Sequence, residues 1–178
     1  GVWVRNCSLI LVAKNVYIKI PVNPSFNPNP STDGIKAIRK LSNHSIPVNC
    51  TLIFTPEQAL LAAKAGAKIA SIFAGRIDDF IREKNKIKFK KEDYFPAEGI
   101  FRKNKLLEDN GIISGIDSVA QTVKIFNKYK IQCEVLAASI RNPRQLREAA
   151  LVGANIATAP LDVIKLALAH KKSQEGMK

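Results

Sequence analysis

The chain has 178 residues, 46% of them hydrophobic and 24% charged, which is the composition of one soluble globular domain. Its three cysteines lack the spacing of a disulfide framework or a zinc site, which favours a reducing cytoplasm, and no apolar segment has the length of a membrane span or an export signal. The net charge of +13 attracts phosphates, but no nucleic-acid motif accompanies it, so we expect neither a membrane nor a nucleic acid as a partner.

Short apolar runs of strand length alternate with longer stretches of helical spacing along the chain. The predicted strands are Val16–Pro21, Val48–Phe54, Ile69–Phe73, Gln132–Ala138 and Asn155–Ala159. The predicted helices are Gly34–Asn43, Pro56–Ala65, Ser118–Tyr129, Pro143–Leu151 and Leu161–Ala169. This alternation predicts an α/β protein with a parallel sheet whose strands are buried on both faces.

Polar caps, prolines and glycines mark the ends of several predicted helices. Thr55 and Asn142 each precede a proline, the arrangement of an N-cap followed by proline at the first helical position. Gly66 and Gly153 follow Ala-rich helices, where a left-handed residue commonly ends a helix. Residues 23–31 contain three prolines and are predicted to form a turn-rich loop.

A lysine interrupts the first predicted strand, within the segment Tyr17–Pro21. Lysine is almost never buried without a reason. Burial of Lys19 would disfavour the charged ammonium and leave a neutral amine able to attack a carbonyl. The alternative is a strand-end lysine that extends its head group to solvent, and this segment alone favours that alternative.

The second predicted strand carries Asn49 and Thr51, which are two residues apart and therefore point to the same face. If that face lines a barrel interior, an amide and a hydroxyl meet there and can hold substrate hydroxyls or a catalytic water. A purely structural hydrogen-bonded pair explains the two residues equally well.

Two later strands each end at an arginine. Arg76 follows one predicted strand, and Ser139 and Arg141 follow another. Ligands of β/α barrels bind at the carboxyl ends of the strands. Two guanidinium groups, a hydroxyl and helix-terminal N–H groups form a credible clamp for a phosphate monoester. The alternative is that each arginine is a surface residue beside an acid.

Residues 82–109 form a polar and basic segment. From Arg82 to Lys105, nine basic and four acidic residues give it a net charge of +5. Runs of charge are usually solvated surface, so an exposed loop is the first expectation. A lid or an oligomer contact that attracts anionic substrates is the functional alternative.

Five short segments of the sequence are Ile18–Pro21, Asn49–Phe54, Gly75–Asp79, Val135–Arg141 and Ile156–Pro160. Together, and in this order, they resemble the transaldolase and fructose-6-phosphate aldolase family. The match covers roughly residues 15–170, with a gap at the basic segment, which is an insertion relative to the family.

The resemblance implies a (β/α)8 TIM barrel of the class I aldolase type that uses neither metal nor cofactor. A strand lysine forms an imine with a ketose, the C3–C4 bond breaks, and the bound dihydroxyacetone unit attacks an aldose phosphate. The resemblance assigns these roles to Lys19 as the imine former, to Asn49 and Thr51 for substrate hydroxyls and the catalytic water, to Ser71 and Phe73 as pocket residues, and to Arg76, Ser139 and Arg141 for the phosphate.

Phe73 and Asn49 favour the transaldolase branch, because the aldolase branch typically has tyrosine and glycine at these positions. The expected reaction transfers a dihydroxyacetone unit between fructose 6-phosphate and erythrose 4-phosphate in the pentose phosphate pathway. The alternatives are a fructose-6-phosphate aldolase-like enzyme and a catalytically inactive fragment or relative that binds phosphates or nucleic acid through the basic segment.

The chain departs from the family at its amino-terminal end. In the family, three strand–helix units precede the lysine strand and supply an acid for proton transfer, whereas only fifteen residues precede the predicted strand Val16–Pro21 here, and residues 1–14 read as a remnant or a preceding helix. Asp78 and Asp79, assigned to a loop, and Asp162 are poor substitutes by position. We expect one barrel domain over residues 1–178 with about five parallel strands, as a fragment, a truncated gene product, or a divergent protein that completes its sheet with a partner, and we expect a homo-oligomer.

Overall fold

The computed structural model describes residues 15–23 and 31–177. Its main sheet is parallel and has five strands in the order β1-β2-β3-β6-β7. The strands are β1 (Ile18–Pro21), β2 (Val48–Ile53), β3 (Ile69–Ile72), β6 (Glu134–Ala137) and β7 (Ile156–Ala157). Each lies inside a range that the sequence predicted, so all five strand predictions are confirmed.

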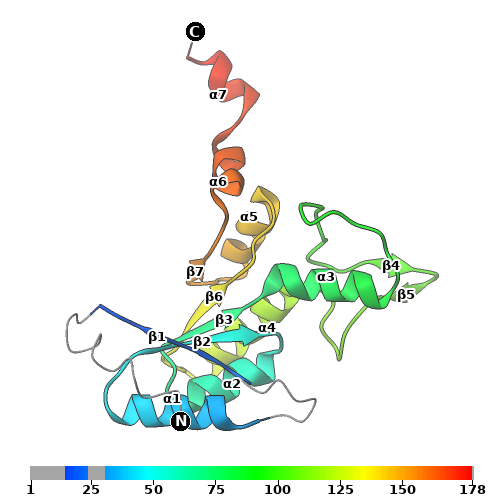
Figure 1. Cartoon of the computed structure of the whole chain (residues 1–178). Helices are drawn as coiled ribbons and strands as arrows, with labels where there is room; N and C mark the ends of the chain where they lie inside the picture. The colour runs from blue at the N-terminus through cyan, green and yellow to red at the C-terminus, as the bar shows by residue number, and fades with distance from the viewer. Residues whose placement is uncertain (1–14, 24–30, 178) are drawn as a thin grey trace.

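Seven helices are described; some connect strands and cover one side of the sheet, and the last two follow the last strand (Figure 1). They are α1 (Asp33–Asn43), α2 (Pro56–Ala65), α3 (Ala74–Lys84), α4 (Gly115–Lys128), α5 (Pro143–Leu151), α6 (Leu161–Leu168) and α7 (Lys171–Glu175). The five predicted helices are confirmed, but α3, α7 and the short hairpin of β4 (Phe101–Arg102) and β5 (Lys105–Leu106) were not predicted.

The predicted helix caps are present in the structure. The Thr55 hydroxyl accepts a hydrogen bond from the Gln58 N–H at 3.3 Å, and Asn142 accepts one from the Gln145 N–H at 2.9 Å. Gly66 ends α2 with φ of +107°, a conformation that glycine adopts without a steric penalty. Local sequence therefore fixes where α2 and α5 begin.

The two faces of the sheet differ in burial. Side chains directed at the helices are apolar and at most 5% exposed: Ile20, Val48, Cys50, Ile53, Ala70 and Ile72. On the opposite face Lys19 is exposed and Asn49 is half-buried, whereas Ser71 and Leu136 are buried, so the prediction of burial on both faces is confirmed for β3 and β6 and was wrong for β1. The helices α1, α2 and α4 pack on one face only, and the other face is the one that a closed barrel would enclose.

The architecture is an α/β fold consistent with an incomplete barrel. In the described part of the chain, β1 and β7 each pair on one side only. Beyond β7, the helices α6 and α7 extend away from the sheet (Figure 1). No helix within residues 15–23 and 31–177 combines the length and the apolar character needed to cross a membrane.

The basic segment is more ordered than a solvated loop. Arg82 belongs to α3 and is 4% exposed, with its guanidinium 5.0 Å from the ring centroids of both Phe89 and Phe95. It donates hydrogen bonds to the carbonyl oxygens of Asp93 and Tyr94, at 3.0 and 2.8 Å. The expectation that Arg82 is an exposed loop residue was therefore wrong, because its charge is satisfied by the backbone that folds over it.

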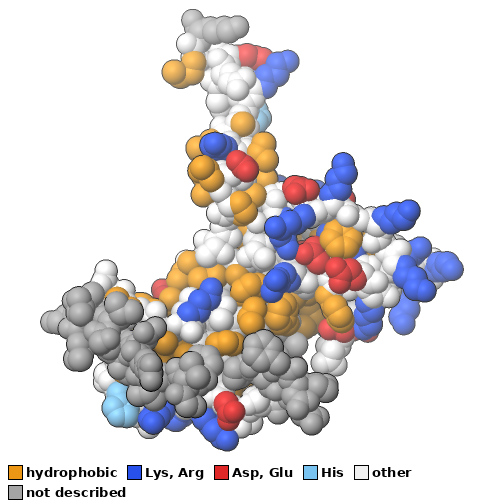
Figure 2. Space-filling model, viewed as in Figure 1, with side chains coloured by type: hydrophobic (Ala, Val, Ile, Leu, Met, Phe, Trp, Pro, Cys, Tyr) orange, Lys and Arg blue, Asp and Glu red, His pale blue; other side chains and the backbone are white. Residues whose placement is uncertain are grey.

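Other cations of this segment remain at the surface, where Figure 2 shows Lys and Arg side chains gathered around the β4–β5 hairpin. The exposed lysines are Lys84, Lys86, Lys88, Lys90, Lys91, Lys103 and Lys105. Lys84 forms an ion pair with Asp109 at 3.0 Å. The expected solvated surface is thus confirmed for the lysines.

Candidate active site

The strand residues selected from the sequence meet on the face that the helices leave uncovered. Lys19 of β1 is the register partner of Asn49 of β2, and partners in a parallel pair point to the same side of the sheet. The Ser71 hydroxyl of β3 donates a hydrogen bond to Asn49 Oδ1 at 2.6 Å. This polar row crosses three neighbouring strands and consists of Lys19, Asn49, Thr51 and Ser71.

Lys19 differs from the expectation of a buried amine, because its side chain is exposed. Its neighbour Ile20 turns toward the helices and is 5% exposed, so the apolar character of β1 belongs to the opposite face. No described residue forms an ion pair with Lys19. The amine can therefore be reached from solvent, and the described residues form no apolar enclosure around it.

The other members of the polar row are less exposed than Lys19. Ser71 is 2% exposed and Thr51 is 7% exposed. Because the Asn49 carbonyl oxygen accepts the Ser71 hydroxyl, the Asn49 amide NH2 group is directed elsewhere, and no described residue accepts from it. An amide donor and the Thr51 hydroxyl thus lie on β2, the strand that pairs with the Lys19 strand.

A β-bulge shapes the end of β2. The register between β2 and β3 shifts between Cys50 and Ile53, and Leu52 adopts φ of +56°. The extra residue returns Ile53 to the core, where it is 0% exposed, after Thr51 has pointed to the polar face. No pattern in the sequence predicts this bulge, because a left-handed leucine is rare.

The ends of β3 and β6 bring Ser139 and Arg141 against the first turn of α3, which also carries Arg76. A Cβ atom built on Gly75, in the first turn of α3, would lie 2.1 Å from the Ser139 carbonyl oxygen and 2.6 Å from Arg141 Nε. Gly75 therefore lets the loop after β6 rest directly on α3. This strand-end cluster consists of Gly75, Arg76, Ser139 and Arg141.

Each arginine of the strand-end cluster has a defined neighbour. Arg76 is exposed, and its guanidinium carbon lies 5.6 Å from the centre of the Phe73 ring. Arg141 is half-buried and forms an ion pair with Asp79 at 2.6 Å. The amino end of an 11-residue helix adds its partial positive charge at the same place.

A pocket of about 510 Å³ lies beside α3. Its lining includes Arg76 and Asp79 together with Phe54, whose ring centroid is 5.9 Å from that of Phe73. Phe73 is half-buried, so an aromatic pair with an adjacent arginine borders the carboxyl end of β3.

Sequence reasoning missed the buried residues behind this cluster. Asp78 and Asp79 were assigned to a loop but lie in α3, where Asp78 is 2% exposed. Asp78 accepts hydrogen bonds from the Gly115 N–H and from Gln145 Nε2, both at 2.7 Å. Burial raises the pKa of Asp78 to about 7, outweighing the hydrogen bond from Gly115 and the charge of Arg82, which lower it. The sequence signal for these buried residues was the pair of adjacent acids, Asp78 and Asp79, that follows Arg76.

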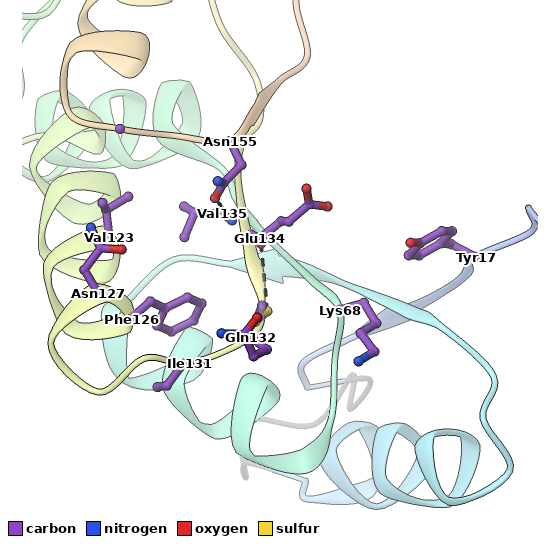
Figure 3. Close-up of a pocket in the computed structure, with 12 residues that line it drawn as sticks. Tyr17, Lys68, Val123, Phe126, Asn127, Ile131, Gln132, Glu134, Val135 and Asn155 are labelled. Carbon is purple, nitrogen blue, oxygen red and sulfur yellow. Dashed lines mark hydrogen bonds between the residues drawn. The ribbon is translucent and has the colours of Figure 1, made fainter.

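A second pocket, of about 390 Å³, lies at the opposite end of the sheet (Figure 3). It is lined by residues at the amino ends of strands, among them Tyr17, Lys68, Glu134 and Asn155. None of the predicted site residues borders it. Because barrels bind ligands at the carboxyl ends of their strands, we place the candidate site at the polar row and the strand-end cluster.

Residues 5–178 match the sequence profile of the family described as transaldolase/fructose-6-phosphate aldolase. A probable transaldolase of Desulfatibacillum aliphaticivorans is 38% identical over 169 residues, which cover 95% of this chain and 61% of the relative. Probable transaldolases of Chlorobium phaeobacteroides (strain BS1) and Thermoplasma volcanium are 38% and 36% identical and are covered to 59% and 56% of their lengths.

The chain thus spans 56 to 61% of the length of these curated relatives. Among solved structures, a mandelate oxidase variant aligns with 86% of this chain at a TM-score of 0.44 and 19% identity, a likeness too low to support an argument. The profile match over nearly the whole chain and the shared identity with three probable transaldolases agree with the resemblance stated from the sequence. The chain belongs to the transaldolase/fructose-6-phosphate aldolase family.

Proposed function

We propose that this chain carries the Schiff-base half of a transaldolase, with Lys19 as the amine that condenses with a ketose phosphate. The observation that carries this proposal is the polar row, in which Lys19 is the register partner of Asn49 and Ser71 hydrogen-bonds Asn49. The row lies on the sheet face that a barrel would enclose, and the chain belongs to a family named for this activity.

In the proposed reaction, the Lys19 amine attacks the ketose carbonyl and water leaves, giving an imine. The C4 hydroxyl then gives its proton to the catalytic water, the C3–C4 bond breaks with its electrons moving into the imine, and the aldose product departs. The resulting enamine attacks the carbonyl of an aldose phosphate, forming a new carbon–carbon bond, and water releases the product from Lys19. The Asn49 amide and the Thr51 hydroxyl hold substrate hydroxyls and the water.

The strand-end cluster supplies the proposed phosphate site. Arg76 and Arg141 offer two guanidinium groups, Ser139 offers a hydroxyl, and the first turn of α3 offers N–H groups. Ser139 has φ of +64°, a rare conformation for serine that recurs at functional sites. The exposed lysines of the basic segment would attract anionic substrates toward this end of the sheet.

We propose transfer of the three-carbon unit rather than its release. Phe73 brings no hydroxyl to the carboxyl end of β3, so no phenol is available there to donate a proton to the enamine. Fructose 6-phosphate with erythrose 4-phosphate should therefore yield sedoheptulose 7-phosphate and glyceraldehyde 3-phosphate. Free dihydroxyacetone as the only three-carbon product would assign the chain to the aldolase branch.

Borohydride trapping tests the imine. Reduction in the presence of fructose 6-phosphate should add irreversible mass at Lys19, and Lys19→Met should abolish the addition. Lys68→Met, another exposed lysine beside the same sheet, should leave it unchanged. Labelling that is spread over many lysines, or that persists in Lys19→Met, contradicts the proposal.

A second candidate function is a phosphate-binding relative without catalysis, and the exposure of Lys19 favours it. Such a protein would bind fructose 6-phosphate through the strand-end cluster and show no trapping at Lys19. For either function we propose a homo-oligomer in a reducing cytoplasm. Cys50 and Cys133 are free thiols in the described chain, which fits that compartment.

A further inference from the structure

Arg141 is held at both its backbone and its guanidinium by consecutive acids of α3. Its N–H donates a hydrogen bond to Gln145 Oε1 at 2.8 Å, and Gln145 Nε2 donates to Asp78 at 2.7 Å. Its guanidinium pairs with Asp79 at 2.6 Å. Asp78 and Gln145 are each 2% exposed, so the connection runs through the protein interior.

The connection ends at a third helix. Asp78 also accepts the N–H of Gly115, the first residue of α4, at 2.7 Å. A Cβ on Gly115 would lie 2.0 Å from the Ala74 carbonyl oxygen, so α4 begins in direct contact with the start of α3. The loop that carries Arg141 is thus connected by hydrogen bonds to α3 and α4, two helices that pack on the core.

The guanidinium of Arg141 is oriented by Asp79 but keeps hydrogen-bond donors that have no partner among the described residues. Its ion pair with Asp79 uses one contact, between Nη2 and Oδ2, and the side chains are 13% and 20% exposed. Among described residues, Arg141 Nε and Asp79 Oδ1 are buried without a hydrogen-bond partner. A charged group with one fixed contact and remaining donors suits binding of an oxyanion, because the conformational freedom of the side chain is already restricted before the ligand arrives.

We propose that Asp79 is a positioning residue for Arg141, assisted by the Asp78–Gln145 hydrogen bonds, and that it sets the affinity of the strand-end cluster for phosphorylated substrates. This inference rests on the proposed phosphate site. The role is specific: Asp79 acts through Arg141 and touches no reacting atom. Loss of Asp79 should therefore weaken binding of the phosphate and leave condensation at Lys19 intact.

The test uses Asp79→Asn, which keeps the volume and one oxygen acceptor but removes the charge. Borohydride trapping is measured at increasing fructose 6-phosphate and, separately, at increasing dihydroxyacetone, which has no phosphate. We expect the half-saturating concentration of fructose 6-phosphate to rise about tenfold while that of dihydroxyacetone is unchanged. Asp79→Glu should recover part of the loss. The control is Asp33→Asn, whose partner Lys36 lies on the surface of α1.

Three outcomes overturn the positioning role: no change for fructose 6-phosphate, an equal change for both ligands, or an equal change in the Asp33→Asn control. A titration with inorganic phosphate, followed by the phosphorus resonance, separates this inference from the imine proposal. If the parent chain shows no trapping, the imine proposal fails. Weaker phosphate binding by Asp79→Asn would then still support the role of Asp79, and unchanged binding would still reject it.

Discussion

Asp78 combines deep burial with two hydrogen bonds, and burial raises its pKa to about 7. The usual aspartate pKa is about 3.9. Between these values the folded chain keeps a proton that the unfolded chain has released, so this group lowers stability as the pH rises toward 7 and adds no further change above it. Because its pKa is raised in the folded state, the Asp78 carboxyl makes the chain more stable at mildly acidic pH than at pH 8.

Urea unfolding of the parent chain and of Asp78→Asn at pH 5, 6, 7 and 8 tests this sign. The asparagine should be the less stable variant at pH 5, because its amide NH2 faces the NH2 of Gln145. Its deficit should shrink by roughly 2 to 3 kcal/mol by pH 8, since only the parent loses stability over this range. A deficit that is constant with pH, or that grows, contradicts the raised pKa.

Gly75 is required by the close approach of the loop after β6. An added methyl group would lie 2.1 Å from the Ser139 carbonyl oxygen, a backbone atom that cannot rotate away. Gly75→Ala should cost about 1 to 3 kcal/mol in the free energy of unfolding and should weaken phosphate binding, because Arg141 must move. Gly176→Ala, where the nearest atom would be 3.5 Å away, is the matched control and should change neither quantity.

At the scale of elements, Arg82 joins α3 to residues 86–98. Its guanidinium lies between two phenyl rings and donates to two carbonyl oxygens, so the loop folds around a charge that the backbone satisfies. Arg82→Met keeps the apolar length but removes these contacts. We expect stability to fall by about 2 to 4 kcal/mol and trypsin cleavage at Lys88 and Lys90 to accelerate.

Arg147→Met is the control for this prediction, because Arg147 is an exposed arginine of α5 without a described ion pair. It should leave the cleavage rate unchanged. Slow cleavage of Arg82→Met, equal to that of the parent chain, would show that the loop is held by its other contacts, such as the Tyr94–Glu148 hydrogen bond of 2.6 Å.

The strands and most helices could be predicted from sequence because their signals are local. Thr55 and Asn142 cap helices through bonds to residues three positions away, and β2 alternates polar and apolar side chains until its bulge. Helix α3 was missed because its two acids look like a loop until their partners are known. Those partners, Gly115 and Arg141, lie 37 and 62 residues further along the chain.

For the candidate site, too, the sequence predicts what depends on local signals and misses what depends on long-range packing. The resemblance identified the polar row and the two arginines and the serine of the strand-end cluster, and the structure aligns the polar row and places Ser139 and Arg141 against the start of α3. The exposure of Lys19 and the support of Arg141 by Asp79 could not be predicted, because both depend on which elements pack around them. An apolar flanking sequence indicated that β1 has a buried face, but not that Lys19 points away from it.

At the scale of the whole molecule, apolar side chains remain uncovered at the carboxyl-terminal end. Leu161, Leu166 and Leu168 of α6 are 62 to 79% exposed, with Leu166 at 62% and Leu168 at 79%. The helix extends away from the sheet (Figure 1); it contacts α5 and buries Val163, but these three leucines stay exposed. Exposed apolar groups of this kind favour association between copies.

We therefore expect the chain to self-associate through α6, and salt dependence separates this contact from an ionic one. A net charge of +13 makes copies repel each other, so apolar association should strengthen between 0.05 and about 0.5 M salt as the repulsion is screened. Light scattering after size exclusion should show a larger mass at high salt. Leu166→Lys should weaken association about tenfold, since it places a charge in the contact. Gln174→Lys adds the same charge on α7 and should change the mass little. A parent chain that stays monomeric at both salt concentrations, or that dissociates as salt is added, would exclude an apolar contact through this helix.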